Sequence, residues 1–230
     1  MLIHTTDFVE GARSARGIVV VIDVFRAFSL AAYAFARGAR QIIPIADVDD
    51  ARELKRANPD WLLVGERHAR RLPGFDSGNS PTELESFDLA DRTLIHTTHA
   101  GTQGLTSVPQ ESEALTGALV NAGAIVRYLR ARQPSEVTLV RMGHEARERC
   151  AEDDLCAELL AARLKGEAFD TAPIRKELSG ATSAQKFFDP GCDWAPARDF
   201  DLCTQVDVFD FILQYDRTAV PPRLRRVDAL

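Results

Sequence analysis

The sequence has no long hydrophobic run and no excess of positive charge. Its longest aliphatic run, residues 18–24, contains Asp23 and is far shorter than the roughly 20 apolar residues that a membrane span needs. The chain has 28 Lys and Arg residues against 34 Asp and Glu residues, a formal net charge of -6. Proteins that bind nucleic acid need clustered basic side chains. We therefore expect neither a membrane nor a nucleic-acid partner.

Cysteine is scarce, and its spacing indicates no metal site or redox motif. The four cysteines include no CxxC pair, and the five histidines form no ligand-like pair, so spacing gives no indication of zinc. The first 17 residues lack the basic-then-apolar order of a signal peptide. These features predict a cytoplasmic protein. The cysteines are Cys150, Cys156, Cys192 and Cys203.

Short β-rich runs alternate along the chain with amphipathic or alanine-rich segments. This alternation predicts an α/β fold, with a parallel or mixed sheet covered by helices on both faces. We expect strands at residues 17–23, 41–45, 61–65, 93–97, 113–117, 136–141 and 206–212. Helices are expected at residues 28–37, 48–57, 101–106, 120–132 and 154–164.

No repeat, low-complexity tract or flexible linker divides the sequence. We therefore expect a single domain over residues 1–230. Residues 169–197 are less regular and contain Pro173, Pro190 and Pro196. This segment is expected to form short helices that wrap the sheet or reach a partner subunit in a homo-oligomer.

Polar residues follow five of the expected strands, where ligands bind in open α/β sheets. Each also has a structural interpretation: Asp23 and Asn121 could cap helices, Glu66 and Arg67 could form a surface pair, and His99 and His144 could be ordinary loop residues. The concentration of such residues at one sheet edge indicates a site. The residues are Asp23, Arg26, Glu66, Arg67, Asp76, Asn79, Ser80, Thr97, Thr98, Gly101, Thr102, Asn121 and Asp153.

The segment GFDSGNSP, residues 74–81, concentrates turn-forming residues. It could be a surface loop only. Alternatively, Gly78 allows close approach of a ligand, Asn79 and Ser80 supply hydrogen bonds, and Pro81 begins a helix whose N-terminus favours anions. Together with the carboxylates, which are preferred ligands of Mg²⁺, this segment predicts a site for a small doubly anionic ligand and a divalent ion.

The ordered segments VVVIDVFRAFS, GERHARRLPGFDSGNSP, HTTHAGTQGL, ALVNAGAIV and EDDLCAELL closely resemble the 2-phosphosulfolactate phosphatase family, and FDLCTQVDVFDFI resembles its characteristic ending. The resemblance runs from about residue 17 to 212. It implies a three-layer α/β/α fold particular to that family, with a mixed, largely parallel sheet. It also implies a Mg²⁺-dependent phosphatase that converts (2R)-2-O-phospho-3-sulfolactate to sulfolactate and phosphate, a reaction of coenzyme M biosynthesis.

The chain departs from the family pattern at several positions. Phe28 stands where a hydroxyl is common, Ala100 where many relatives have asparagine, and Gln103 where many have arginine. Arg147 and Glu148 lie in altered surroundings before the acidic pair. The acidic residues are kept, so the departures bear on the substrate rather than on the phosphatase chemistry.

We assign roles to these residues as hypotheses. Asp23, Arg26, Glu66 and Asp153 are expected to be catalytic, and Asp23, Glu66, Asp76 and Asp153 to hold Mg²⁺. Substrate contacts are expected from Arg67, Gly78, Asn79, Ser80, Thr97, Thr98, Gly101, Thr102 and Asn121. Whether Asp23 binds metal or attacks phosphorus stays open.

Two other functions compete with this hypothesis. A haloacid-dehalogenase-type phosphatase would need a second acid two residues after Asp23, where Phe25 stands. The other is a module that binds a small anion without turnover.

Overall fold

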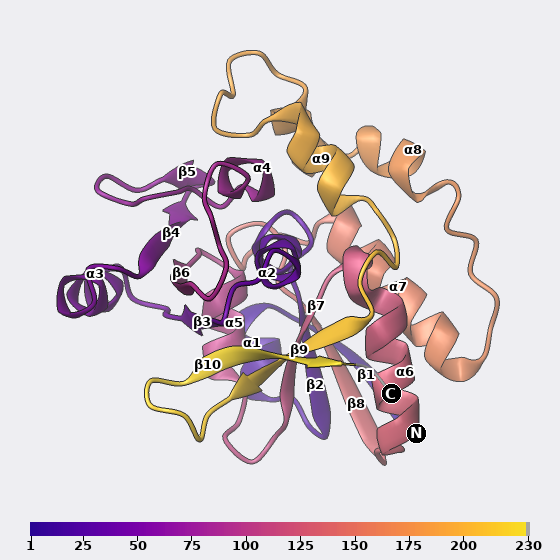
Figure 1. Cartoon of the computed structure of the whole chain (residues 1–230). Helices are drawn as coiled ribbons and strands as arrows, with labels where there is room; N and C mark the ends of the chain where they lie inside the picture. The colour runs from indigo at the N-terminus through magenta and orange to yellow at the C-terminus, as the bar shows by residue number, and fades with distance from the viewer. Residues whose placement is uncertain (229–230) are drawn as a thin grey trace.

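The computed structural model describes residues 1–228, and ten strands in this part of the chain form one sheet (Figure 1). Their order across the sheet is β1-β8-β2-β7-β9-β10-β3-β6-β4-β5. The strands are β1 (Leu2–Asp7), β2 (Ile18–Ile22), β3 (Gln41–Pro44), β4 (Leu62–Arg67), β5 (Arg70–Arg71), β6 (Thr93–Thr97), β7 (Ala114–Gly117), β8 (Glu136–Arg141), β9 (Phe211–Asp216) and β10 (Arg223–Asp228).

The sheet consists of two parallel blocks joined by an antiparallel hairpin. The first block is β1-β8-β2-β7, and the second is β3-β6-β4. The hairpin β9–β10 pairs with the first block at Leu115↔Gln214 and with the second at Leu224↔Ile42. The predicted mixed, largely parallel sheet is confirmed.

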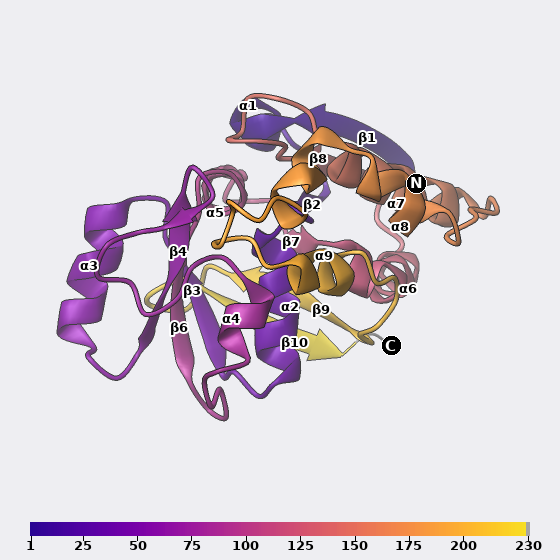
Figure 2. The same ribbon diagram turned by 90° about the horizontal axis from the view of Figure 1, so that it is seen from above.

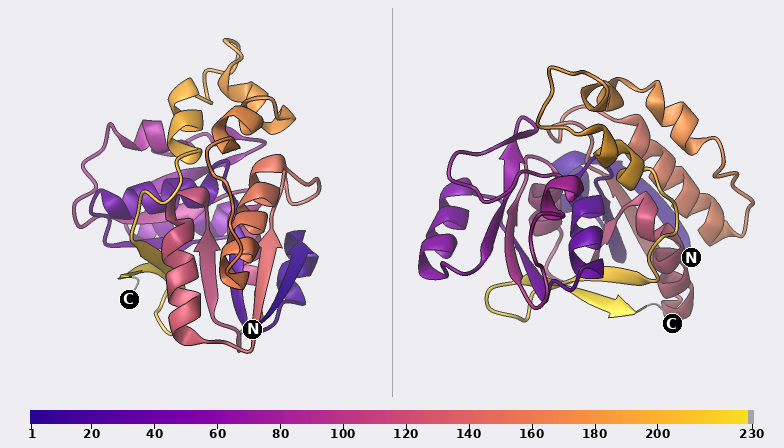
Figure 3. Two further views of the ribbon diagram at one scale, coloured as in Figure 1. Left: turned by 90° about the vertical axis from the view of Figure 1, so that its right-hand side faces the viewer. Right: turned by 45° about the horizontal axis from the view of Figure 1, so that its top comes forward.

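Helices cover both faces of the sheet, as the α/β prediction requires. Helices α6 and α7 pack together on one face of the first block, and α1 and α5 pack on the other (Figure 3). Helix α2 lies between the two blocks in Figures 1 and 2. The helices are α1 (Phe8–Arg13), α2 (Ala27–Ala36), α3 (Val48–Ala57), α4 (Pro81–Leu84), α5 (Gly101–Ser107), α6 (Ala122–Arg132), α7 (Ala151–Lys165), α8 (Ile174–Ser179) and α9 (Ala197–Cys203), with 3-10 helices η1 (Leu119–Asn121) and η2 (Thr182–Phe187).

Strand β2 is buried on both faces, which explains its uninterrupted aliphatic sequence. Val19 and Val21 pack in the core that contains α2 and α5, whereas Val20 and Ile22 pack in the core that contains α6 and α7. Successive strand residues point to opposite faces, so both faces must be apolar when helices cover both. Asp23 is the first residue after this buried strand, which places its carboxylate at the sheet edge.

Six predicted strands and five predicted helices are present with small shifts in their ends, but the strand expected at residues 206–212 is wrong. That strand, β9, begins at Phe211, because residues 207 and 209 donate backbone hydrogen bonds to Leu119 and Val120 outside the sheet. Strands β1 and β10 and helix α1 were not predicted. Residues 169–197 contain the short helices α8 and η2. No helix within residues 1–228 is both long and apolar enough to cross a membrane.

Candidate active site

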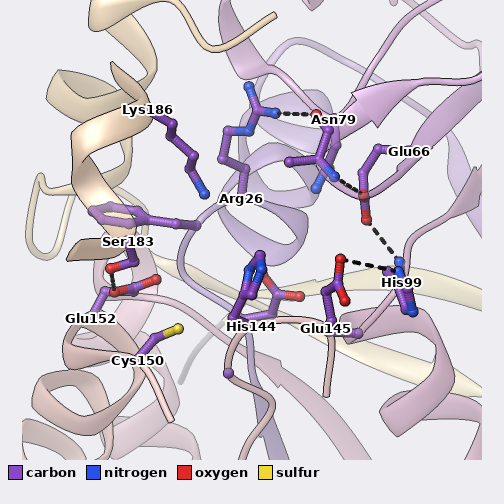
Figure 4. A pocket seen from close by; sticks show the side chains of 15 residues that line it. Arg26, Glu66, Asn79, His99, His144, Glu145, Cys150, Glu152, Ser183 and Lys186 are labelled. Carbon is purple, nitrogen blue, oxygen red and sulfur yellow. Dashed lines mark hydrogen bonds and ion pairs between the residues drawn. The ribbon is translucent and has the colours of Figure 1, made fainter. Parts of the chain in front are cut away.

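The carboxyl ends of four parallel strands, β2 and β8 from the first block and β4 and β6 from the second, border one cavity of about 50 Å³. Figure 4 shows Lys186 and Arg26 on one side and Glu66, His99 and Glu145 on another. Ligands of open α/β folds bind at such strand ends. The cavity is lined by Asp23, Phe25, Arg26, Glu66, Ala69, Asn79, His99, Ala100, Gly143, His144, Glu145, Cys150, Glu152, Ser183 and Lys186.

Asp23 and Glu66 place two carboxylates in this cavity. Asp23 Oδ1 accepts a hydrogen bond from the Ala27 backbone N–H at 3.1 Å, and Oδ2 accepts none from residues 1–228. Burial of Asp23 and the nearby charge of Glu66 raise its pKa to about 7. Glu66 accepts hydrogen bonds from the backbone N–H groups of Ala69 and His99, each at 2.7 Å. The free oxygen of Asp23 and the fixed carboxylate of Glu66 are hard oxygen donors that suit Mg²⁺.

Asn79 presents a side-chain amide to the cavity from the GFDSGNSP segment. Its Oδ1 lies 3.2 Å from Nε2 of His96, a buried residue of β6. Burial lowers the pKa of His96 to about 4, so its imidazole is neutral at pH 7 and Nε2–H can donate to Asn79. With Oδ1 occupied in this way, the Nδ2 group remains available to donate to a ligand.

Two cationic side chains, Arg26 and Lys186, line the cavity, and among the residues that the structure describes only Lys186 has no ion-pair partner. Arg26 Nη1 donates to Asp199 Oδ2 at 2.7 Å and to the Trp194 carbonyl at 3.0 Å, and Nη2 donates to the Ala69 carbonyl. Lys186 has no ion pair or hydrogen bond with residues 1–228, and its ammonium lies 5.1 Å from the centre of the Phe187 ring. Burial and the neighbouring Arg26 lower the pKa of Lys186. An anion entering the cavity would relieve this electrostatic cost.

Asp153 holds two strand ends together behind the cavity and does not line it. Its two carboxylate oxygens accept hydrogen bonds from Val24 N–H at 2.9 Å and Gly143 N–H at 2.8 Å, after β2 and β8 respectively. Burial, with the charge of Asp23, raises the pKa of Asp153 well above its usual range. Each oxygen thus accepts one backbone hydrogen bond, as each oxygen of Glu66 does, but Asp153 does not line the cavity. Its role as a metal ligand stays a prediction.

Three further predicted residues use their hydrogen-bonding groups to bind other parts of the protein. Asp76 lies outside the cavity, where it pairs with Lys55 at 2.9 Å and accepts from Leu63 N–H at 2.7 Å. Gly78 N–H donates to Glu83. Arg67 donates to the carbonyls of Glu66 and Ala46 and to the Thr97 hydroxyl.

Ser80 is also fully engaged. Its hydroxyl donates to Asp199 Oδ1 at 2.8 Å and accepts from Glu83 N–H at 3.1 Å, capping α4. Pro81 begins that helix, as predicted. Within GFDSGNSP, therefore, Asn79 faces the cavity, and its neighbours Gly78 and Ser80 stabilise the loop.

The remaining predicted substrate contacts do not line the cavity. Thr98 and Thr102 hydrogen-bond to each other at the start of α5. Gly101 packs so closely on Asp23 that an added Cβ would lie 2.7 Å from Oδ2, so it permits this approach. Asn121 occupies the N-cap position of α6 but makes no side-chain cap, and its buried Oδ1 has no partner within residues 1–228.

Several cavity residues were not among the predicted site residues. Lys186 and Ser183 belong to η2, and Glu152 accepts the Ser183 hydroxyl at 2.5 Å. His144 and Glu145 come from the turn after β8. Glu152 begins the segment EDDLCAELL that carries the family resemblance, and His144 was considered only as an ordinary loop residue. Nothing in the local sequence around Lys186 indicates a site.

Cys150 lines the cavity, but its environment opposes a nucleophilic role. Burial, with the charges of Glu152 and Asp153, raises the pKa of its thiol. The thiol therefore stays protonated at neutral pH, whereas a nucleophilic cysteine needs the thiolate.

The structure places three of the departures from the family pattern. Phe28 is 1% exposed and packs in the core around α2, so it cannot contact a ligand. Ala100 lines the cavity, and Gln103 does not. Of these three positions, Ala100 alone borders this cavity.

Fold and cavity together define an α/β protein with an acidic site at the carboxyl ends of its parallel strands. Residues 3–218 match the sequence model of the family described as 2-phosphosulpholactate phosphatase. The chain therefore belongs to this family, which is named for the hydrolysis of a phosphoric monoester.

Individual relatives agree with this assignment. The chain is 30% identical over 214 residues to a "Probable 2-phosphosulfolactate phosphatase" of Bacillus subtilis, covering 91% of this chain and 92% of that protein. Proteins with the same name from Carboxydothermus hydrogenoformans and Thermotoga petrophila are 31% and 34% identical over 203 and 171 residues. These matches cover 84% of both chains for the first, and 74% of this chain and 69% of the relative for the second.

Proposed function

We propose that this protein is a Mg²⁺-dependent phosphatase that hydrolyses (2R)-2-O-phospho-3-sulfolactate or a closely related small phosphorylated acid. The observation that carries the proposal is the free buried carboxylate oxygen of Asp23 beside Glu66, in a cavity that also contains the unpaired ammonium of Lys186. The family name and the names of the relatives supply the reaction and the substrate class.

Asp23 and Glu66 are the residues that would hold Mg²⁺. Mg²⁺ usually binds one or two carboxylates and completes its coordination with water and substrate oxygens. When bound, the ion neutralises charge on the phosphate and activates a water for attack. Glu66 is held by two backbone N–H groups, so its carboxylate is oriented before any ligand arrives.

Lys186 and Asn79 bind the anionic part of the substrate in this proposal. The Lys186 ammonium and the Nδ2 group of Asn79 are two donors at the cavity wall that have no hydrogen-bond partner within residues 1–228. Arg26 orients the wall by holding the Trp194 and Ala69 carbonyls, and its pairing with Asp199 limits what it can offer to substrate.

The proposed substrate carries more than one anionic group, and the structure has room for them. A second cavity of about 590 Å³ adjoins the first and shares Lys186, Ser183, Cys150, His144 and Glu145 with it. Lys186 therefore borders both spaces. We propose that the phosphate enters the smaller cavity and that the remaining acidic groups extend into the larger one.

A panel of phosphomonoesters tests the proposal, with phosphosulfolactate and phospholactate included and with Mg²⁺ present or removed by chelator. We expect chelator to abolish phosphate release and Mg²⁺ to restore it. Asp23→Asn should lower turnover by at least about two orders of magnitude, because it removes the charge that holds the metal. Full activity in excess chelator would contradict the metal dependence.

Asp76→Asn is the matched control, since it makes the same change in another acid that the sequence predicted to hold Mg²⁺. Its carboxylate binds Lys55 and Leu63 outside the cavity, so we expect normal turnover per folded molecule. A folded wild-type protein that binds these anions but releases no phosphate from any of them would indicate a non-catalytic anion-binding module.

A further inference from the structure

Three side chains far apart in the sequence meet at the rim of the cavity. His68 lies at the tip of the β4–β5 hairpin, His99 follows β6, and Glu145 follows β8. Within residues 1–228 they are the one group of three His, Cys, Asp or Glu residues whose ligand atoms all lie within 4.8 Å of one another. Figure 4 shows His99 and Glu145 side by side at this rim.

Within this cluster, the Nδ1 atoms of the two histidines both lie near one carboxylate oxygen of Glu145. His68 Nδ1 lies 2.5 Å from Glu145 Oε1, and His99 Nδ1 lies 4.0 Å from the same oxygen. The two imidazole rings meet edge to face with their centres 5.0 Å apart. His99 Nδ1 is buried and has no hydrogen-bond partner within residues 1–228. A buried polar atom without a partner is uncommon and calls for an explanation.

Two imidazoles and one carboxylate form a donor set suited to a first-row transition-metal ion. Zinc binds such sets tetrahedrally, with Zn–N and Zn–O distances near 2.0–2.2 Å, so its ligand atoms lie ~3.3 Å apart. The His68–Glu145 contact would need to lengthen and the His99–Glu145 contact to shorten, each by less than roughly 1 Å. The exposed His68 side chain can make this adjustment, because it is 73% exposed.

We propose that His68, His99 and Glu145 bind one divalent transition-metal ion of the zinc type at the rim of the cavity. This site is separate from the carboxylates Asp23 and Glu66, and its nitrogen donors favour a softer ion than Mg²⁺. Three protein ligands leave the fourth position of a tetrahedral ion open to water or an anionic oxygen. The proposal does not rest on the phosphatase reaction.

The position of the cluster gives the ion access to a ligand in either cavity. Glu145 borders both cavities, His99 borders the smaller one and His68 the larger one. The backbone N–H of His99 also donates to Glu66, which fixes the loop that carries this imidazole. An ion at the cluster would therefore add positive charge at the junction between the two spaces.

Binding of Zn²⁺ alone to the full chain tests the proposal, measured by calorimetry in millimolar Mg²⁺ without substrate. The absorption spectrum of the Co²⁺-substituted protein would report tetrahedral coordination. We expect one bound Zn²⁺ ion, and an affinity at least about tenfold weaker in His68→Gln and in Glu145→Gln, since each removes a ligand. Anomalous scattering at the zinc edge should place the ion between the three side chains.

His4→Gln is the matched control, because His4 Nε2 pairs with Glu136 at 3.3 Å in the same way but belongs to no group of three such ligands within residues 1–228. We expect it to leave the Zn²⁺ affinity unchanged, and Asp23→Asn to retain zinc binding as well. Absence of stoichiometric binding, an affinity unaffected by His68→Gln and Glu145→Gln, or a zinc peak at Asp23 and Glu66 would each overturn the proposal. None of these outcomes depends on phosphatase activity.

Discussion

The cavity wall and the layer of polar residues behind it differ in how many hydrogen-bonding atoms are already occupied. At the wall, Asp23, Asn79 and Lys186 each keep an atom without a partner in the described chain. Behind it, Asp153, Asp199 and Ser80 are bound to other parts of the protein. Residues of both kinds come from loops and from helices, so their local sequence does not distinguish them. The comparison teaches that wall substitutions should affect ligand binding, whereas substitutions behind the wall should affect stability.

Asp199→Asn is expected to cause the largest loss of stability. Asp199 is fully buried, pairs with Arg26 at 2.7 Å and accepts from Ser80 and Thr82. Removing its charge leaves the Arg26 guanidinium buried without a counterion, which typically costs roughly 3–5 kcal/mol. Urea unfolding should measure this loss.

Glu85→Gln serves as the control for Asp199→Asn, because Glu85 forms an exposed ion pair with Arg198 on the same helix α9. Exposed pairs contribute little. Equal unfolding midpoints for the Asp199→Asn protein and the wild type would contradict the idea that polar residues behind the cavity wall stabilise the fold.

His96 should make the protein less stable in acid. Its pKa is about 4 in the folded protein and near 6.5 in the unfolded chain, so the unfolded chain binds the proton more readily. The stability that depends on neutral His96 is therefore complete above about pH 6.5 and falls by roughly 3 kcal/mol as the pH approaches 4.

His96→Gln removes this titration and keeps a donor for Asn79. We expect its free energy of unfolding to fall less steeply between pH 7 and pH 4 than that of the wild type. Parallel curves for the two proteins would mean that His96 is accessible to protons in the folded state.

Asn79→Ala and Ser80→Ala compare two neighbouring residues, of which Asn79 lines the cavity and Ser80 lies behind its wall. Loss of a hydrogen bond to a charged ligand costs about 1.5–3 kcal/mol, so kcat/KM of Asn79→Ala should fall roughly 10- to 150-fold. Ser80→Ala removes the cap of α4 and a donor to Asp199, which should lower stability by about 1 kcal/mol or somewhat more. Its kcat/KM per folded molecule should change little.

Steady-state kinetics and thermal melts on the two variants provide the measurement. If Ser80→Ala loses as much kcat/KM as Asn79→Ala while remaining folded, both residues contact substrate and the assignment from hydrogen bonding is wrong.

The sequence predicted those parts of the fold whose residues are buried on two faces or have clear helical periodicity. Strand β2 is an example, since all five of its residues are buried. Strand β1 is only half-buried, and β10 has the sequence RLRRVD, in which Leu224 is the one fully buried residue. Their hydrophobic patterns were too weak to indicate strands, although β10 lies inside the sheet.

The predicted residues that line the cavity lie at or just after strand ends, with the exception of Asn79, which came from the turn-rich segment GFDSGNSP. Asp23 and Glu66 were found because each ends or follows a buried strand. Lys186 comes from a short 3-10 helix, and its approach to the cavity depends on how residues 169–197 fold over the sheet. The occupied state of Asp153 and Ser80 depends on partners 129 and 119 residues away, which no local pattern reveals.

The hairpin that joins the two strand blocks has a consequence for the order of folding. Every residue that lines the smaller cavity precedes residue 187, yet the strand pairing that connects the two halves of its border begins at Phe211. Arg223 of β10 binds Gln41 of β3, a partner 182 residues earlier in the chain. Pairings between such distant residues form slowly, because the intervening chain must be ordered first. During synthesis, therefore, the cavity should reach its final shape only after the last strands have left the ribosome.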